Sequence, residues 1–175
     1  MFRITRKRLA GISSVLTMVL VLVLGPTALA TGPVVHHVSA GGPDACTFFG
    51  FTHPGCDGNF SLVANEYADG SVSGQYTDRF ARGDGFHAVI DCLSVVGNDA
   101  WVSGVITSGI FTDPDTGEVF DLTGLPVATM VRDNGTSAND TADQISFSFL
   151  GDPTPCTEQV AYPLFDAPEG QVRVR

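Results

Sequence analysis

Histidine and carboxylate spacing offers one candidate for acid–base chemistry in this chain. The four histidines are His36, His37, His53 and His87. Only His87 has an acid at strand spacing, because Asp91 follows four residues later and residues i and i+4 of a strand share a face. A His/Asp pair can orient a general base, but no G-x-S-x-G nucleophile accompanies this pair. We therefore interpret His87 as a hydrogen-bonded strand residue near a barrel mouth and assign no catalytic residue.

Two acidic segments contain the hard oxygen ligands that calcium prefers. The first is residues 113–118, where Asp113, Asp115 and Glu118 surround a glycine turn. The second comprises Asp133, Asn134, Asp140 and Asp143. The first is only a fragment of an EF-hand loop, and Asp, Asn and Gly also form tight turns. We interpret both segments as solvated turns, so the sequence assigns no metal-binding or ligand-binding residue and implies no cofactor.

A third motif is the integrin-binding tripeptide Arg82, Gly83 and Asp84. A given tripeptide arises often by chance, and Arg-Gly-Asp-Gly is also good turn chemistry. We expect a hairpin tip there rather than an adhesive site.

The four cysteines read as a disulfide framework. Cys46 and Cys56 are ten residues apart in a stretch rich in Gly and Pro, Cys92 lies within a predicted strand, and Cys156 follows Pro155 in a late loop. Three pairings exist, and the short loop favours Cys46 with Cys56, which leaves Cys92 with Cys156. Zinc binding is the competing use, but no C-x-x-C or Cys/His spacing of the zinc type is present.

Charge excludes several classes of partner. The chain carries 9 Lys and Arg against 19 Asp and Glu, and four of the basic residues lie in the first eight positions. If residues 1–30 are removed, five basic residues face 19 acidic ones, a net charge of −14. Such a surface repels phosphate backbones and anionic lipid, so we expect neither nucleic-acid nor membrane binding. No Lys follows position 7, which excludes a lysine Schiff base.

Residues 1–30 have the pattern of a secretory signal peptide. A basic start is followed by an apolar stretch at 12–24, by Pro26, and by Ala28-Leu29-Ala30 with small residues at the cleavage site. An apolar core of about 13 residues is short for a membrane anchor, which needs about 20. We expect cleavage before Thr31 and release of a secreted, extracellular product.

The remaining chain shows no sustained 3.6-residue periodicity and reads as all-β. Apolar or β-branched runs between turn residues predict strands at 34–40, 59–67, 72–81, 86–96, 100–108, 118–122, 127–133, 144–150 and 171–175. The expected fold is a single antiparallel β-barrel or two-sheet sandwich of about eight strands. The expected division is 1–30 as signal peptide, 31–58 as an N-terminal strand and Cys-containing loop, and 59–175 as the barrel or sandwich.

Local patterns refine this fold. Turn residues at 69–70 and 97–99 predict that the four strands between 59 and 108 form a meander. The strand at 86–96 has apolar residues on both parities, which indicates a strand covered on both sides or interrupted by a bulge. Ile145, Phe147 and Phe149 alternate with serines and should share one face. Four prolines predict an irregular tail before the last strand.

Several of these segments together resemble a group of secreted bacterial proteins of unknown function. Residues 86–100 are similar to its strand H-x-x-V-x-C-L-x-V-x-G-N-x-A, with Ile90 at the first Val. Residues 131–135 and 143–146 match its V-x-D-N-G and D-Q-I-S, residues 69–75 its D-G-S-V-S-G-Q, and residues 170–174 its closing strand. The resemblance implies an all-β fold and an extracytoplasmic address, and no activity. The group continues D-N-G-E where this chain has Thr136, which argues against a shared acidic metal site.

The sequence therefore predicts a secreted, non-catalytic all-β protein that either binds an extracellular ligand or surface component or forms part of an envelope-associated assembly. Two alternatives remain open. A Phe-rich interior would suit a lipocalin-like carrier of a small apolar ligand, and His87 with a carboxylate would suit a hydrolase. A filled interior favours the first interpretation, an empty apolar cavity above about 300 Å³ the second, and a cleft at His87 the third.

Overall fold

The protein is described here by a computed structural model that covers residues 32–43, 58–80, 83–113, 115–135, 141–167 and 170–175. The predicted signal peptide with its cleavage site, and the predicted pair of Cys46 and Cys56, lie outside these residues.

Eleven strands make up most of the described chain. They are β1 (Val34–Pro43), β2 (Asn59–Tyr67), β3 (Val72–Arg79), β4 (Gly85–Val96), β5 (Asp99–Thr112), β6 (Val119–Asp121), β7 (Pro126–Arg132), β8 (Gln144–Ser146), β9 (Phe149–Leu150), β10 (Leu164–Asp166) and β11 (Gln171–Val174). A short 3₁₀ helix, η2 (Cys156–Glu158), lies between β9 and β10.

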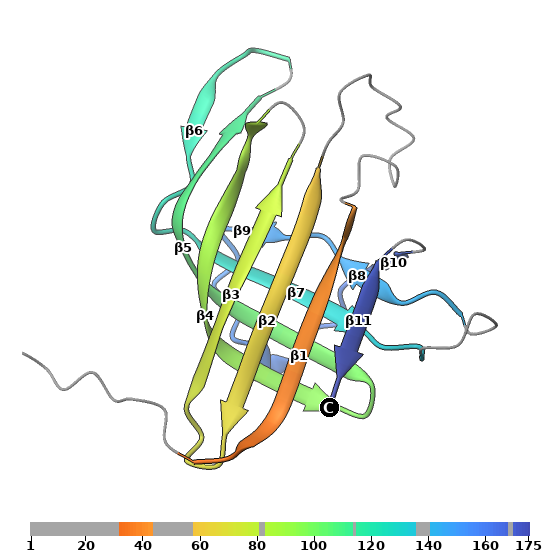
Figure 1. The fold of residues 1–175 in the computed structure, drawn as a ribbon. Coiled ribbons are helices and arrows are strands. Elements are labelled where there is room, and N and C mark those ends of the chain that lie inside the picture. Colours follow the sequence, from red (N-terminus) through yellow and green to blue (C-terminus); the bar gives the residue numbers. More distant parts are fainter. Residues whose placement is uncertain (1–31, 44–57, 81–82, 114, 136–140, 168–169) are drawn as a thin grey trace, which may run out of the picture.

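All strands belong to one antiparallel sheet with the order β10-β8-β7-β5-β4-β3-β2-β1-β11, to which β6 adds beside β5 and β9 beside β7. The sheet curls into a half-barrel in which β7 crosses behind β1, β2 and β3 (Figure 1). The all-β prediction is confirmed, and the consecutive pairing of β2 to β5 confirms the meander. β1 pairs with both β2 and β11, so the N-terminal strand is an integral part of the same sheet.

Two bulges between β4 and β5 produce the curl. The register shifts between His87 and Ala88, where Thr107 is the extra residue on β5, and again between Ile90 and Cys92, where Asp91 is the extra residue on β4. A bulge bends its strand and increases the local twist. The inward parity of β4 accordingly changes from Phe86, Ala88 and Ile90 to Leu93. Of the two explanations for the mixed pattern at 86–96, the structure shows the bulge, and the second half of β4 is in addition covered on both faces.

Glycine is required where the bend brings β4 and β5 close together. Gly104 pairs with Ile90 next to the Asp91 bulge. A Cβ atom at Gly104 would overlap the carbonyl oxygen of Val89 and lie 2.8 Å from the Cα atom of Ile90. Both contacts are with backbone, which cannot move aside as a flexible side chain can, so any side chain at position 104 would disturb the bend.

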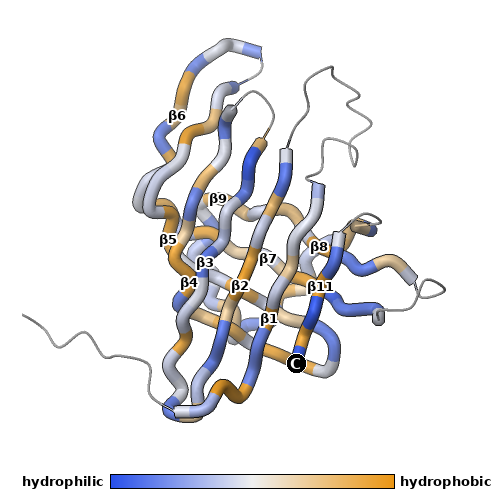
Figure 2. The backbone as a smooth tube through the Cα atoms, in the orientation of Figure 1, coloured by the Kyte–Doolittle hydropathy of each residue, from blue (hydrophilic) through white to orange (hydrophobic). Residues whose placement is uncertain are grey.

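The concave interior is filled by one continuous apolar cluster. Hydrophobic residues recur along the long strands (Figure 2), and those that face inward are almost completely buried. The following members, one from each of six strands, are each at most 1% exposed: Val38, Leu62, Tyr76, Ile90, Val102 and Val131. The burial of apolar side chains such as these is the main favourable term in the free energy of folding.

A second, smaller cluster lies on the opposite face of the sheet, beneath residues 151–163, which we call the strap. Trp101 and Met130 from β5 and β7 pack with Cys156 there, and Tyr162 packs against them. The indole Nε1 of Trp101 donates a hydrogen bond to the carbonyl oxygen of Val160 at 2.7 Å. The sheet is therefore covered on both faces along this half of β4, β5 and β7.

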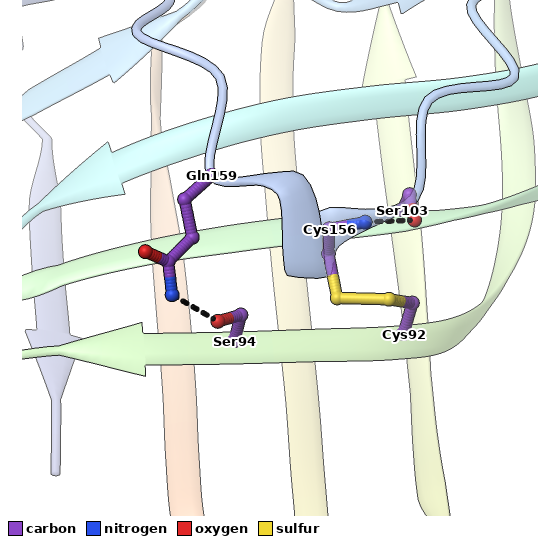
Figure 3. Close-up of a disulfide and its surroundings, with 5 residues drawn as sticks. All are labelled: Cys92, Ser94, Ser103, Cys156 and Gln159. Carbon is purple, nitrogen blue, oxygen red and sulfur yellow. Dashed lines mark hydrogen bonds between the residues drawn. A yellow bond between two sulfur atoms is a disulfide. The ribbon is translucent and has the colours of Figure 1, made fainter.

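A disulfide fixes the strap to β4, as predicted. Cys92 and Cys156 are bonded with their Cα atoms 5.8 Å apart (Figure 3). Gln159 Nε2 donates to Ser94 Oγ at 3.0 Å, and the backbone N–H of Cys156 donates to Ser103 Oγ at 3.3 Å. Cys92 can reach the strap because the Asp91 bulge turns its side chain to the outer face.

Two predictions for the last third of the chain are wrong. The tail before the final strand contains an additional strand, β10, whose pairing with β8 places Leu164 opposite Ser146. The strand predicted at 144–150 is divided into β8 and β9. Its alternation is lost as well, because Ile145 and Leu150 pack on the inner cluster whereas Phe149 stacks on Tyr162 at 4.2 Å. Phe147 and Ser148, at the break between the two strands, change the parity as a bulge does.

Gly104→Ala should lower the free energy of unfolding by about 2–3 kcal/mol, because the new methyl group meets fixed backbone at the bend. The matched control is Gly41→Ala in β1, where the nearest atom to a Cβ would be the carbonyl oxygen of Phe60 at 3.4 Å. Urea unfolding of the two variants measures the difference. Equal losses would contradict the role of Gly104 in the bend.

Cys156→Ser should lower the free energy of unfolding by roughly 4 kcal/mol, because the bond closes a loop of 64 residues in the unfolded chain. Cys56→Ser, whose predicted loop is much shorter, should cost less. Melting temperatures compare the variants, and non-reducing peptide mapping checks the pairing. Recovery of free thiols at Cys92 and Cys156 from protein purified without reductant would show the assignment to be wrong.

The strap should also loosen at high pH. The hydroxyl of Tyr162 donates to Asp152 Oδ2 at 2.8 Å. Burial and this hydrogen bond raise the pKa of Tyr162 to about 12 from its ordinary value of 10.0. Because the folded protein favours the protonated phenol, this stabilisation is complete below pH 10 and is lost as the pH rises toward 12. Urea unfolding at about pH 9 and pH 11 should show a smaller loss for Tyr162→Phe than for the wild type; equal losses would exclude this coupling.

Candidate functional site

The first acidic loop uses its carboxylate to form a turn. Asp113 Oδ1 accepts hydrogen bonds from the backbone N–H groups of Asp115 and Thr116, both at 2.8 Å. These bonds lower the pKa of Asp113. Within the part of the chain that the structure describes, no three His, Cys, Asp or Glu side chains gather in a way that could hold a metal ion. The contacts support the interpretation of 113–118 as a turn.

The second acidic segment joins β11 to the far side of the half-barrel. Asp143 Oδ2 accepts from the backbone N–H of Val172 at 2.7 Å, and its Oδ1 accepts from that of Asn134 at 2.9 Å. Asp133 Oδ2 accepts from the N–H of Val174 at 3.0 Å. Asp143 is only 8% exposed. We call these contacts the carboxylate seam. Through them the two carboxylates accept hydrogen bonds from backbone N–H groups of the edge strand β11 that have no neighbouring strand on that side within the described chain. Asp140, the remaining member, lies outside the described residues.

Several residues of the motifs noted in the sequence lie at this seam, whereas His87, from the first of those motifs, does not. Asn98, from the turn between β4 and β5, donates its side-chain amide to the carbonyl oxygen of Asp133 at 2.7 Å. The next residue, Asp99, forms a two-point ion pair with Arg132 at 2.6 and 2.8 Å. The amide of Asn134 donates to the carbonyl oxygen of Ala142. These motif residues therefore hold the fold together, and they are not arranged around a shared opening.

Asp84 of the Arg-Gly-Asp tripeptide is likewise occupied. Its two carboxylate oxygens accept from the backbone N–H of Thr112 at 2.6 Å and from the Thr112 hydroxyl at 3.0 Å. The side chain therefore links the connection between β3 and β4 to the end of β5. An integrin ligand needs this carboxylate to be accessible, so the contacts argue against the adhesive interpretation. Arg82 lies outside the described residues.

His87 lies in an array of outward-facing positions on β3, β4 and β5. One row across the three strands is Thr77, His87 and Ser108, and the next is Arg79, Gly85 and Ile110. Adjacent strands are about 4.8 Å apart, so the missing side chain at Gly85 leaves roughly 10 Å between the backbones that carry Arg79 and Ile110. The array therefore has a gap at its centre.

An open cavity of about 430 Å³ occupies this gap, and we call it the Gly85 hollow. All six members of the two rows line it, together with backbone or side-chain atoms of Asp78, Phe80, Gly83, Asp84, Phe86 and Gly109. A side chain at position 85 would meet the carbonyl oxygen of Asp78, and the positive φ of 135° there favours glycine. The hollow is thus built into the backbone of β4.

A second open groove of about 600 Å³ continues from the hollow along the same face. It is lined mainly by short neutral side chains of β2, β3 and β4, and Thr77 borders both cavities. Val63 and Val89, 41% and 51% exposed, supply an aliphatic floor between Ser61, Ser73, Gln75 and Asn65. The hollow and the groove together present hydroxyl and amide groups next to aliphatic surface.

His87 is a hydrogen-bonded strand residue, as interpreted from the sequence, and it does not form the candidate pair with Asp91. Its Nδ1 is hydrogen-bonded to the Thr77 hydroxyl at 2.8 Å. Asp91 is the bulge residue four positions along β4, roughly 13 Å away at strand spacing. A hydroxyl–imidazole pair is the first part of a nucleophilic site, but a third group must orient the base. Among the described residues none is hydrogen-bonded to the other ring nitrogen, so the array offers binding groups rather than a complete catalytic set.

Aromatic side chains line the inner face at the open end of the half-barrel. Ring contacts run from Tyr76 through Phe86, Phe80 and Phe111 to Phe120, with centroids 5.2 to 6.5 Å apart. The series ends in Phe111 and Phe120, which are 38% and 43% exposed. Deeper in the interior the apolar cluster fills the space. The apolar surface is therefore a wall at the rim.

Sequence reasoning identified His87 but not its neighbours. Thr77, Arg79 and Ser108 belong to no motif, and they come together only through strand register. The bulge at Thr107 turns Ser108 outward, and a bulge position could not be read from the pattern. The one feature of the sequence that could have indicated the hollow is Gly85, a glycine that follows a turn segment yet belongs to the strand.

Comparisons with known protein families, curated proteins and solved structures found no match for this chain. None of the helices in the described residues is both long enough and apolar enough to span a bilayer.

Asp143→Asn should lower the free energy of unfolding by about 2 kcal/mol, because the amide group can accept only one of the two backbone bonds that the carboxylate accepts. Asp115→Asn is the matched control: among the described residues its carboxylate accepts no hydrogen bond, and its removal should cost less than about 0.5 kcal/mol. Chemical unfolding at neutral pH compares the two. A seam that contributes nothing would give the same midpoint for both variants.

Proposed function

We propose that this protein is a secreted, non-catalytic binding protein that holds a small polar extracellular ligand in the Gly85 hollow. The observation that carries the proposal is the array around Gly85. The absence of a side chain at this position leaves a hollow, and the polar side chains of Arg79, Thr77, His87 and Ser108 line it. Concave sites with a few placed polar groups are the usual form of small-molecule sites. The N-terminal leader and the disulfide support an extracellular location.

Hydrogen-bonding capacity defines the ligand. Thr77, Ser108 and His87 can donate and accept, Arg79 donates, and Ile110 offers aliphatic surface. Such a set suits a molecule with several hydroxyl groups and a C–H face, as carbohydrates have. The neighbouring groove, with its serines, amides and valines, would extend the same chemistry to a longer ligand.

A second candidate function is carriage of a small apolar ligand. The exposed rings of Phe111 and Phe120 at the rim of the half-barrel favour it. The filled interior weighs against it, since a carrier of this type encloses its ligand. The two candidates differ in where a retained molecule sits and in its polarity.

Mass spectrometry of small molecules retained by the natively purified secreted protein tests the proposal. Wild type should retain a hydroxyl-rich compound, and Ser108→Trp should lose it, because the indole fills the hollow from an exposed position with little effect on stability. Val96→Trp is the control, since Val96 is 53% exposed and lies at the far end of β4.

Retention of the same compounds by all three proteins, or of none by wild type, would contradict binding in the hollow. A retained lipid that survives Ser108→Trp and is lost in Phe120→Ser would establish the carrier function instead.

A further inference from the structure

The Gly85 hollow contains an arginine whose charge the described structure leaves uncompensated. Arg132 is engaged by Asp99, in the one ion pair found among the described residues. Arg79, at the exposed end of β3, makes neither an ion pair nor a side-chain hydrogen bond within the described part of the chain. After residue 30 the chain has five Arg and no Lys. The position of one of these few cations, Arg79, at a cavity therefore points to an anionic group in the ligand.

Both acidic residues at the hollow direct their oxygens elsewhere. Asp84 accepts from the backbone and hydroxyl of Thr112, as described above. Asp78 is 4% exposed and belongs to the inner face, where its Oδ2 accepts from the hydroxyls of Tyr76 and Ser148. Their charges weaken the attraction of Arg79 for an anion but do not occupy the guanidinium. The donors that face the hollow therefore remain those of Arg79 and the hydroxyl row.

The spacing of these donors fits an acid that also carries hydroxyl groups. Arginine presents a planar fork that matches the two oxygens of a carboxylate. Thr77, His87 and Ser108 lie one row away on the same three strands, about 7 Å along the strand direction. This distance is close to the length of a sugar ring. Ile110 lies across Gly85 from Arg79 and can contact the C–H face of the ring.

We propose that the Gly85 hollow binds a small hydroxylated carboxylic acid of the uronic acid type, with its carboxylate on Arg79 and its hydroxyls on Thr77, His87 and Ser108. The inference rests on the proposed function and specifies the ligand class for the same site. The nearby charges of Asp78 and Asp84 weaken the binding of an anion, so a monosaccharide should bind in the millimolar range. Among the described residues the groove is lined by Asp91 and by no Arg or Lys, so a longer ligand should bind more tightly only where the part that extends into the groove is neutral.

The test compares D-glucuronate with D-glucose, which differ only in the carboxylate. Amide chemical shifts of the ¹⁵N-labelled mature protein are followed at constant sodium concentration, up to about 50 mM sugar, which detects even weak binding. Glucuronate should shift the signals of Thr77, Gly85 and Ser108 with at least about ten-fold tighter binding than glucose, because a charge-assisted bidentate contact contributes that much.

Three variants assign the effect. Arg79→Gln should remove the preference for glucuronate, and Arg79→Lys should restore only part of it, because lysine keeps the charge but not the fork. Arg173→Gln, in β11, is the control for a general loss of positive charge and should leave the preference unchanged. Arg79 and Arg173 are both exposed, so all three variants should fold, and their melting temperatures check this.

Equal binding of the two sugars, a preference that survives Arg79→Gln, or the absence of any shift at the hollow would overturn the assignment of an acidic ligand. The proposed function fails separately, when the wild-type protein retains no compound that Ser108→Trp loses. A neutral sugar retained by wild type would therefore refute this inference and leave the binding function in place.

Discussion

The bend in β4 and β5 is the constraint on which the rest of the molecule depends. Two extra residues, Thr107 and Asp91, bend the pair and change which face each later side chain occupies. Without the Asp91 bulge, Cys92 would face inward with Ile90 and could not bond to Cys156 on the outer face. Without the Thr107 bulge, Ser108 would share the inward face of Ile106 and would be absent from the hollow. The same irregularities thus create the second layer, position the disulfide and complete the candidate site.

Carboxylate side chains accept hydrogen bonds from backbone N–H groups that have no partner on a neighbouring strand of the described chain. Asp133 and Asp143 accept the N–H groups of β11, and Asp84 accepts that of Thr112. Buried or partly buried N–H groups need acceptors, and a carboxylate provides a stronger one than a neutral group. Part of the acidic composition is therefore structural. Asp133 and Asp143, which the sequence alone presents as candidates for metal binding, instead act as acceptors for β11.

Sequence patterns predicted the strands that alternate cleanly or end at turn residues, and the predicted 59–67 coincides with β2. The Cys92–Cys156 bond followed from loop length and elimination. β10 was missed because three residues between prolines carry too little pattern, and its strand pairing with β8 comes from tertiary contact. The hollow was only partly accessible: His87 has a recognisable chemistry, whereas Arg79, Thr77 and Ser108 become neighbours through register and a bulge. Neither property is encoded in local spacing.

The size of the half-barrel explains why a ligand would bind outside it. A small domain buries a limited share of its surface, and an interior cavity would remove apolar contacts that it needs for stability. Here Tyr76, Ile90 and Val102 are almost fully buried in the interior. A missing side chain on the outer face has no such cost, because Gly85 is surrounded there by exposed residues. Strand register places Arg79 on one side of the gap and Ile110 on the other, with the row of Thr77, His87 and Ser108 at a fixed spacing from both, and the paired strands hold their backbones in place. A binding site on the outer face is therefore compatible with a filled core. A carrier of the lipocalin type would instead need a cavity in that core.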